Sequence, residues 1–389
     1  MYQQFYQRFL NATKGKQHYA CHSHYFWPDV TREAMLAYWD DSAKWVDDKW
    51  EHFFNDVVPA VQQHISRTLN TDHPEQVVFA PNTHEFVYRI LSCLNLAAPQ
   101  TIVTTDSEFH SFNRQINRLD EWANIDVVRV PTQPFATFNQ RFIAAIKQHQ
   151  PDLVFFSQVF FNSGYWVQDI ETIVSAVERE ETLVVIDGYH AFMALPVDIN
   201  TIQQRVFYLG GGYKYAQSGE GVCFAHVPPQ SKLRPVYTGW YAEFGALEKP
   251  KDNHVQYSED GMRFAGATMD FSGLYRMRAV FDLLASENLN VAGINTYVKY
   301  IQQTFLTRLD EQGHALVNRQ ALVVDSLDQC GHFLTFTMPD DATTASIAAF
   351  LKQHGVLTDY RGNRLRFGFG LYHLADEINL SCLHAFENS

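Results

Sequence analysis

The sequence predicts an α/β fold, with a mostly parallel central sheet flanked by helices and a smaller α+β domain. Three observations lead to this prediction. Between about residues 77 and 230, short, almost continuously apolar runs alternate with helical stretches, as in a parallel sheet buried on both faces. From about residue 270 the rhythm changes, which indicates a second, smaller unit. The 389 residues, 46% of them hydrophobic, are enough to bury a large core.

The first part of the pattern is helical and the next part is β-rich. Residues 30–69 carry apolar and aromatic side chains at helical spacing, interleaved with Asp, Lys and Glu, which predicts amphipathic helix. We then expect strands at VVFA (from 77), TIVTT (101), VVRV (127), LVFFS (153), TLVVID (182), RVFYL (205) and GVCFAHV (221).

The C-terminal part begins with the long helical pattern FSGLYRMRAVFDLLAS, and we expect strands at ALVVDS, HFLTFTMP and RLRFGFG. We therefore predict three regions. Residues 1–50 form an N-terminal segment that contributes to the small domain, 51–275 a large α/β domain, and 276–389 a small C-terminal α+β domain.

Charge and composition narrow the classes of function. A net charge of -13 argues against general affinity for nucleic acid or acidic membranes, because both need basic patches. The chain contains no apolar run of about 18 residues and does not start like a secretory signal. We expect a cytoplasmic protein that acts on a small molecule.

The five cysteines are scattered and form no CxxC pair, so neither a disulfide framework nor a structural zinc site is expected. Cys21, His22 and His24 do not have the spacing of a closed four-ligand site, and we predict no metal. Cys330 lies within a strand pattern, which favours a core thiol.

Polar residues that follow predicted strands are the first candidates for a site, because ligands of open α/β sheets lie beyond the carboxyl ends of the strands. Asp187 directly follows LVVI, and His190 stands three residues later. A carboxylate here could pair with a buried cation such as a protonated pyridine nitrogen. Capping of the next turn is the alternative explanation for Asp187.

Lys214 follows the next strand, in GGGYKYAQSGEG. The glycines allow close approach of backbone to a ligand, and the flanking Tyr213 and Tyr215 favour partial desolvation of the lysine. Desolvation lowers the pKa of a lysine and favours the neutral amine that forms Schiff bases. A surface lysine that extends its amine into solvent is the alternative.

A phosphate site is the third candidate feature. After VVFA, the segment PNTHEFVYRILSCL places Asn82 and Thr83 before an amphipathic run, with Glu85 at the position of a capping partner. Backbone N–H groups at such a helix start can bind phosphate. Ordinary helix capping explains the segment equally well.

Together these segments resemble a known family. VVIDGYHAFMALPVDI, RVFYLGGGYKYAQSGEGVCFAHVPP, TGW and RFAGATMDFSGL resemble the fold-type I pyridoxal 5'-phosphate (PLP) enzymes of the class V aminotransferase superfamily, and within it the kynureninase branch. The likeness covers roughly residues 20–380, and the D-x-x-H to Y-K-Y combination is specific for PLP.

The resemblance implies roles for individual residues. Lys214 would hold PLP as a Schiff base, Asp187 would pair with the ring nitrogen, and His190 would sit beside that carboxylate. Thr268 would reach the phosphate of a neighbouring subunit, which implies a homodimer. The further cofactor contacts would be Asn82, Thr83 and Tyr213 at the phosphate, Phe109 stacked on the ring, and Asn162 near the ring hydroxyl. For Phe109, core packing is the alternative.

The resemblance also implies substrate contacts. Arg366, in RLRFGFGLYHLADEI, would clamp the substrate carboxylate, because a planar guanidinium matches a planar carboxylate. Arg361 and Arg364 are close neighbours, and a solvated arginine is the alternative for each. Trp240 falls in the segment where the family recognises the aryl substrate, but the sequence there departs from the family pattern.

By this resemblance, we expect kynureninase-like cleavage of a β–γ carbon bond, giving anthranilate and L-alanine from a kynurenine-type substrate. A class V transaminase or a β-eliminating, desulfurase-type lyase would share the first steps. A nicotinamide-binding Rossmann protein is disfavoured, because the glycine cluster leads into a strand and no G-x-G-x-x-G opens a helix. A binding module without turnover stays open.

Overall fold

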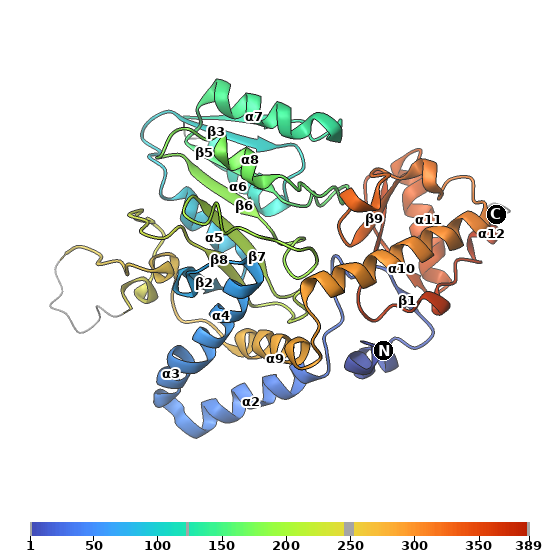
Figure 1. Cartoon of the computed structure of the whole chain (residues 1–389), viewed down its shortest axis with the longest axis horizontal. Helices are drawn as coiled ribbons and strands as arrows, with labels where there is room; N and C mark the ends of the chain where they lie inside the picture. The colour runs from blue at the N-terminus through green and yellow to red at the C-terminus, as the bar shows by residue number, and fades with distance from the viewer. Residues whose placement is uncertain (1, 122–123, 245–252, 387–389) are drawn as a thin grey trace.

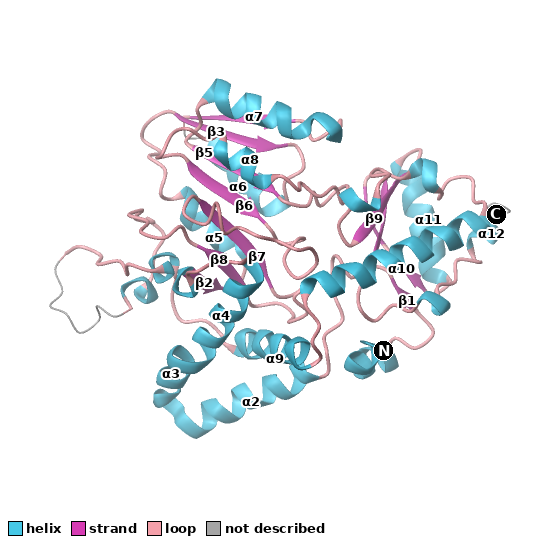
Figure 2. Cartoon of the chain, in the orientation of Figure 1, coloured by secondary structure: helices cyan, strands magenta, loops and turns pink. Residues whose placement is uncertain are grey.

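The structure is a computed structural model that describes residues 2–121, 124–244 and 253–386. Within these residues, seven strands form the main sheet in the order β2-β8-β7-β6-β5-β3-β4 (Figures 1 and 2). Their bounds are β2 Val77–Ala80, β3 Gln100–Thr105, β4 Ile125–Val130, β5 Leu153–Ser157, β6 Leu183–Asp187, β7 Val206–Gly211 and β8 Cys223–His226. Each expected strand of this region is therefore confirmed to within a few residues.

The sheet is mostly parallel, as predicted. Strands β4, β3, β5, β6 and β7 pair in parallel, and β8 runs antiparallel to both of its neighbours. The side chains of β2, β5, β7 and β8 are buried along their whole length because helices cover the faces of the sheet. The surrounding helices are α4 Val58–Leu69, α5 Thr83–Leu91, α6 His110–Asp120, α7 Phe138–His149, α8 Ile170–Ser175 and α9 Ser272–Ser286.

The helical region predicted over residues 30–69 is divided into shorter pieces. Its parts are α2 Val30–Trp45, α3 Lys49–His52, a turn of π-helix at Phe53–Val57, and α4. Val46 has a φ of 49°, which right-handed helix does not allow, so α2 ends there. Helix α2 then packs against α9 beside the main sheet (Figure 1).

The C-terminal part contains a separate, smaller antiparallel sheet, as expected. It has the order β11-β12-β9, and helix α10 runs from the end of α9 to this sheet (Figure 1). Its elements are α10 Val291–Gln312, β9 Phe333–Thr337, α11 Asp341–Gln353, β10 Val356–Leu357, β11 Asp359–Arg361, β12 Arg364–Gly368 and α12 Leu383–Phe386.

One expected strand is wrong. In ALVVDS, Leu322 makes a single bridge to Phe336 instead of a ladder. A 3-10 turn at Arg319–Ala321, capped by the Asn318 side chain, takes in the first residue of this run, and a second 3-10 turn begins at Leu327, directly after it.

The N-terminal segment links the two parts of the molecule. Strand β1, Gln17–His18, follows α1, Gln7–Ala12, and pairs in parallel with β10. Further along, the Tyr25 N–H donates to the Tyr213 carbonyl at 3.4 Å, and the Leu371 N–H donates to the Tyr25 hydroxyl at 2.6 Å. Tyr25 therefore ties the C-terminal part to the loop that carries Lys214. The predicted domain boundaries stay a prediction.

Candidate active site

The carboxyl ends of β5, β6 and β7 converge on one pocket, a cavity of about 190 Å³. Parallel strands end at the same edge of a sheet, so residues far apart in sequence meet there. Seven of the residues predicted for the cofactor line this pocket, namely Asn82, Thr83, Phe109, Asp187, His190, Tyr213 and Lys214.

Lys214 lies in the wall of the pocket and is buried. Its Nζ is 2.7 Å from His190 Nε2, 4.9 Å from the centre of the Tyr189 ring and 5.5 Å from that of Phe109. Burial lowers the pKa of Lys214 to about 8, although the charge of Asp187 opposes this shift. An appreciable fraction of the amine is therefore neutral and nucleophilic near physiological pH.

His190 is neutral in this setting. Burial, with the charge of Lys214 adding to it, holds the pKa of His190 well below its ordinary value. Nε2 can therefore accept a hydrogen bond from the protonated Lys214 amine, whereas the buried Nδ1 has no partner among the described residues.

Asp187 ends β6 and faces the same space. Its Oδ1 accepts a hydrogen bond from the Tyr189 N–H at 3.0 Å. Burial raises the pKa of Asp187, while the Tyr189 N–H and the charge of Lys214 act in the opposite direction. A buried carboxylate of this kind gains from an added cation, such as a protonated ring nitrogen.

Other residues of the pocket lining suit a phosphate. Asn82 caps α5, where its side chain accepts a hydrogen bond from the Glu85 N–H at 3.0 Å, and Thr83 starts the helix. Thr83 and His84, in the first turn of this helix, line the pocket, and the N-terminus of a helix favours an anion. Gly221, with a φ of +87°, also lines it, and a Cβ there would meet only Arg276 within 4.0 Å. A side chain at Gly221 would therefore occupy open space at the pocket lining, which the glycine leaves empty.

A lysine amine, a carboxylate and a helix start therefore lie around one cavity, which is the donor set that PLP needs. The residues present fit that group.

Three other residues predicted for the site, Asn162, Trp240 and Thr268, do not line the pocket. Asn162 accepts a hydrogen bond from the Ser107 hydroxyl at 2.5 Å and stands next to Phe161, which lines the pocket. Trp240 donates from Nε1 to the Thr268 hydroxyl at 3.2 Å, and neither residue lines the pocket of its own chain. The expected role of Thr268 in a neighbouring subunit stays a prediction.

Arg366 is buried behind the pocket on β12. It donates to the Phe161 carbonyl and, at 2.5 Å, to Asp359, while its buried Nε has no partner among the described residues. Burial alone would raise the pKa of Asp359, but the hydrogen bond with His22 and the charge of Arg366 lower it below its ordinary value. Asp359 is therefore ionised and holds the guanidinium in place. Arg361 and Arg364 are more exposed.

Sequence reasoning missed several residues of this site. Glu108, Ser157 and Asp359 lie in or behind the pocket wall and have hydrogen-bonded carboxyl or hydroxyl groups. Glu108 directly precedes Phe109, and Ser157 ends LVFFS, so the strand-end rule applied to Asp187 would have found Ser157 as well.

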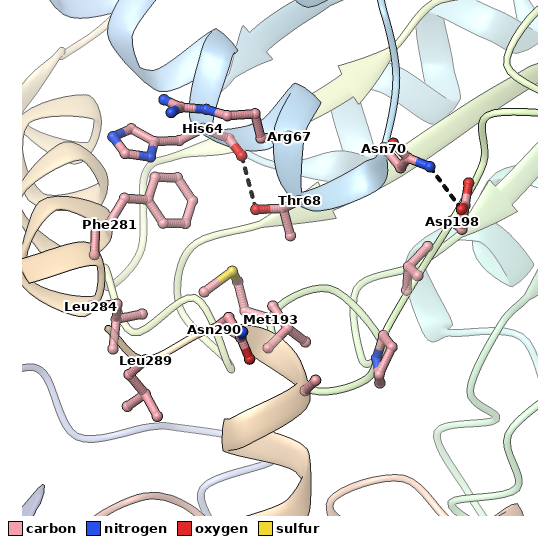
Figure 3. A pocket seen from close by; sticks show the side chains of 15 residues that line it. His64, Arg67, Thr68, Asn70, Met193, Asp198, Phe281, Leu284, Leu289 and Asn290 are labelled. Atoms are coloured by element: carbon pink, nitrogen blue, oxygen red, sulfur yellow. Dashed lines mark hydrogen bonds between the residues drawn. The ribbon is translucent and has the colours of Figure 1, made fainter. Parts of the chain in front are cut away.

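A larger cavity, of about 650 Å³, lies elsewhere, between the end of α4, the loop around Met193 and the start of α10 (Figure 3). No residue predicted for the site lines it. The described residues contain no helix long and apolar enough to span a membrane.

Comparisons with known proteins agree with this geometry. Residues 28–364 match the family described as aminotransferase class-V. The uncharacterized aminotransferase YcbU of Bacillus subtilis (strain 168) is 23% identical over 327 residues, 80% of each chain. A probable cysteine desulfurase of Vibrio cholerae is 21% identical, over 73% of this chain and 70% of the relative.

Solved structures share the fold. The cystine C–S lyase C-DES, in complex with cysteine persulfide, superposes with a TM-score of 0.80 at 18% identity, covering 97% of this chain and 98% of that one. A mutant of the same lyase, with glycine covalently linked to the PLP cofactor, gives a TM-score of 0.79 at 18% identity, covering 99% and 97%.

Proposed function

This chain belongs to the class-V aminotransferase family and is a PLP-dependent enzyme, and from that premise we propose that it cleaves the bond between Cβ and sulfur in a cysteine-like amino acid. The observation that carries the proposal is the buried Lys214 amine, 2.7 Å from a neutral His190, in a pocket that also contains Asp187. The relatives that favour sulfur chemistry are a probable desulfurase and a C–S lyase.

In the proposed reaction, Lys214 would hold the cofactor, and its amine, when released and neutral, would take the Cα proton of the substrate. When bound, PLP supplies an electron sink for the pair left on Cα. That pair forms a Cα–Cβ double bond as the Cβ–S bond breaks, and the sulfur group leaves with the electrons of that bond. The products are a thiolate or persulfide and 2-aminoacrylate, which water converts to pyruvate and ammonium.

The other residues bind and orient. Asp187 would pair with the ring nitrogen, Asn82 and Thr83 would hold the phosphate, and Phe109 would pack against the ring. Tyr213, the other residue predicted to contact the phosphate, lines the same pocket. Arg366 would use its unpaired Nε–H for the substrate carboxylate, because its two terminal nitrogens already donate to Asp359 and the Phe161 carbonyl.

The positions of the thiols favour direct elimination over transfer of sulfur to the protein. Cys223 lines the pocket, but burial raises its pKa to about 12, so it stays protonated. Cys330 is buried, and its thiol donates to the Phe333 carbonyl. Neither thiol is a ready nucleophile for a substrate sulfur.

Kynureninase-like hydrolysis is the second candidate. One observation favours it: Phe109 and Phe161 pack edge to face, 5.8 Å apart, and both line the pocket, where they could contact an aryl group.

The test is to incubate the PLP-loaded protein with L-cystine, L-cysteine and L-kynurenine in parallel. We expect pyruvate and a persulfide from L-cystine, and no turnover by the Lys214→Ala variant. Anthranilate fluorescence from L-kynurenine without pyruvate from the sulfur substrates would select the hydrolase. An amino group transferred to a keto acid, without elimination, would select a transaminase.

A further inference from the structure

Glu108 is a buried carboxyl group that the proposed reaction does not use. It is 1% exposed and lies behind the pocket wall, directly before Phe109. Oε1 accepts hydrogen bonds from the Thr105 hydroxyl at 2.5 Å and the Ser157 N–H at 3.2 Å. Oε2 is 2.6 Å from the Ser157 hydroxyl oxygen.

Ser157 connects this carboxyl group to the pocket. It ends β5 and pairs in register with Asp187 at the end of β6, so both side chains lie on the same side of the sheet. Ser157 and Asp187 both line the pocket. One hydroxyl group therefore connects the Glu108 carboxyl group to the lining of the pocket.

The surroundings of Glu108 favour its neutral form. Its hydrogen-bonding partners are uncharged. Burial, with the charge of Asp187 adding to it, raises the pKa of Glu108 to about 8, although the hydrogen bonds from Ser157 and Thr105 act in the opposite direction. Asp187 is itself coupled to two other buried groups: the charge of Lys214 opposes the raised pKa of Asp187, and the charge of Asp187 adds to the burial that raises the pKa of Tyr208.

The hydrogen-bond pattern leaves Oε2 as the position for a proton. Oε1 accepts from two donors, whereas Oε2 has a single contact, in which the Ser157 hydroxyl donates to an ionised Glu108 and would accept from a protonated one.

We propose that Glu108 is a positioning residue of the cofactor site. It stays protonated in the folded protein, donates from Oε2 to the Ser157 hydroxyl, and so turns that hydroxyl into a donor toward the Asp187 end of the pocket. Asp187 then remains the negative charge that faces the ring. This inference rests on the proposed pairing of Asp187 with the ring nitrogen.

The first experiment measures protonation without the cofactor. Infrared difference spectra between cofactor-free wild type and Glu108→Gln should contain a carboxylic-acid C=O band at pH 7 that disappears as the pH rises past about 8. A wild type without this band at pH 7 has an ionised Glu108, and the proposal is then wrong.

The second experiment measures PLP affinity at pH 7 and pH 9. In wild type, ionisation of Glu108 withdraws the Ser157 donor, so the dissociation constant should rise by roughly three- to tenfold, the effect of one net hydrogen bond. Glu108→Gln imitates the protonated acid at both pH values. Its PLP dissociation constant should therefore rise less than that of the wild type between pH 7 and pH 9, and the difference should be that same factor. Ser157→Ala should bind more weakly by that factor already at pH 7.

Glu108→Gln must be compared with the wild type because the pKa of Lys214 is also about 8, so a pH dependence of the wild type alone does not identify the group that titrates. Asp106→Asn is the matched control. It removes a carboxylate two residues away, which accepts from Thr132, and should follow the wild type. If Glu108→Gln has the same pH dependence as wild type, the proposal is overturned. If wild type binds no PLP at either pH, the assigned cofactor site is wrong and this inference falls with it, whatever the infrared titration gives.

Discussion

At the scale of single residues, burial sets the chemistry of the pocket. Lys214, Asp187 and Glu108 differ in charge type, but burial is the first cause of the pKa shift of each, and each shift favours the neutral form. The pocket without its cofactor is therefore a strained arrangement of poorly solvated groups, which a ligand of complementary charge relieves.

Replacing Lys214 with Met should stabilise the cofactor-free protein. The pKa of Lys214 falls from an ordinary 10.5 to about 8 on folding, so the charged amine costs stability at every pH below about 8. This cost is about 3 kcal/mol and disappears as the pH rises from 8 to 10.5. Urea unfolding at pH 7 and pH 10 measures it. A variant that is less stable than wild type at pH 7 would contradict the expected cost.

Asp359→Asn tests how Arg366 is held. The substitution keeps the shape but removes the negative charge that fixes the buried guanidinium. We expect KM for the amino acid to rise by roughly tenfold or more, with a much smaller change in kcat, because binding rather than chemistry is affected. Asp376→Asn, an exposed carboxylate of the same part of the chain, is the control. A fall in kcat at constant KM would argue against a binding role.

At the scale of elements, the loop after β6 positions Asp187 and His190 by close packing against β7. A Cβ on Gly188 would lie 2.0 Å from the ring of Tyr208, a buried residue whose hydroxyl donates to Gln158 at 2.8 Å. The tyrosine ring would have to shift to relieve this contact, and such a shift disturbs its hydrogen bond to Gln158. The glycine therefore allows the two strands to approach where the site is built.

Gly188→Ala should accordingly lower stability by about 1 to 3 kcal/mol and weaken PLP binding, because the strand ends must move apart. Gly293→Ala is a matched control, since its added Cβ would meet other atoms only at 3.5 Å, an ordinary contact. Thermal unfolding and PLP titration of both variants provide the comparison. Equal behaviour of the two would show that the loop has more freedom than its packing indicates.

At the scale of the whole molecule, Trp240 and Thr268 lie together but away from the pocket lining of their own chain. If they serve a neighbouring subunit, the active protein is a dimer with shared sites. Mixing inactive Lys214→Ala with a Thr268→Ala variant would then create hybrid dimers with one complete site. After equal mixing and subunit exchange, about a quarter of the wild-type activity should return.

Light scattering on the same samples measures whether the mass is twice the 44.8 kDa of one chain. Dimers that regain no activity after exchange would contradict the shared site, provided that Thr268→Ala alone is impaired.

The sequence by itself determined the strands of the main sheet and the residues that follow them. Short, almost continuously apolar runs favour strands that are buried on both faces of a sheet, and the positions of Asp187 and Lys214 then follow from the strand ends. The pattern could not reveal where α2 ends or why ALVVDS forms no ladder, because a backbone turn at Val46 and a 3-10 turn before Leu322 decide them.

Only the tertiary structure decided which distant groups share the buried space. Arg366 donates to the Phe161 carbonyl, 205 residues away in the sequence, and Glu108 meets Ser157, 49 residues away, and faces the charge of Asp187. Local spacing carries no information about such pairs, and the burial that shifts their pKa values exists only when the sheet is assembled.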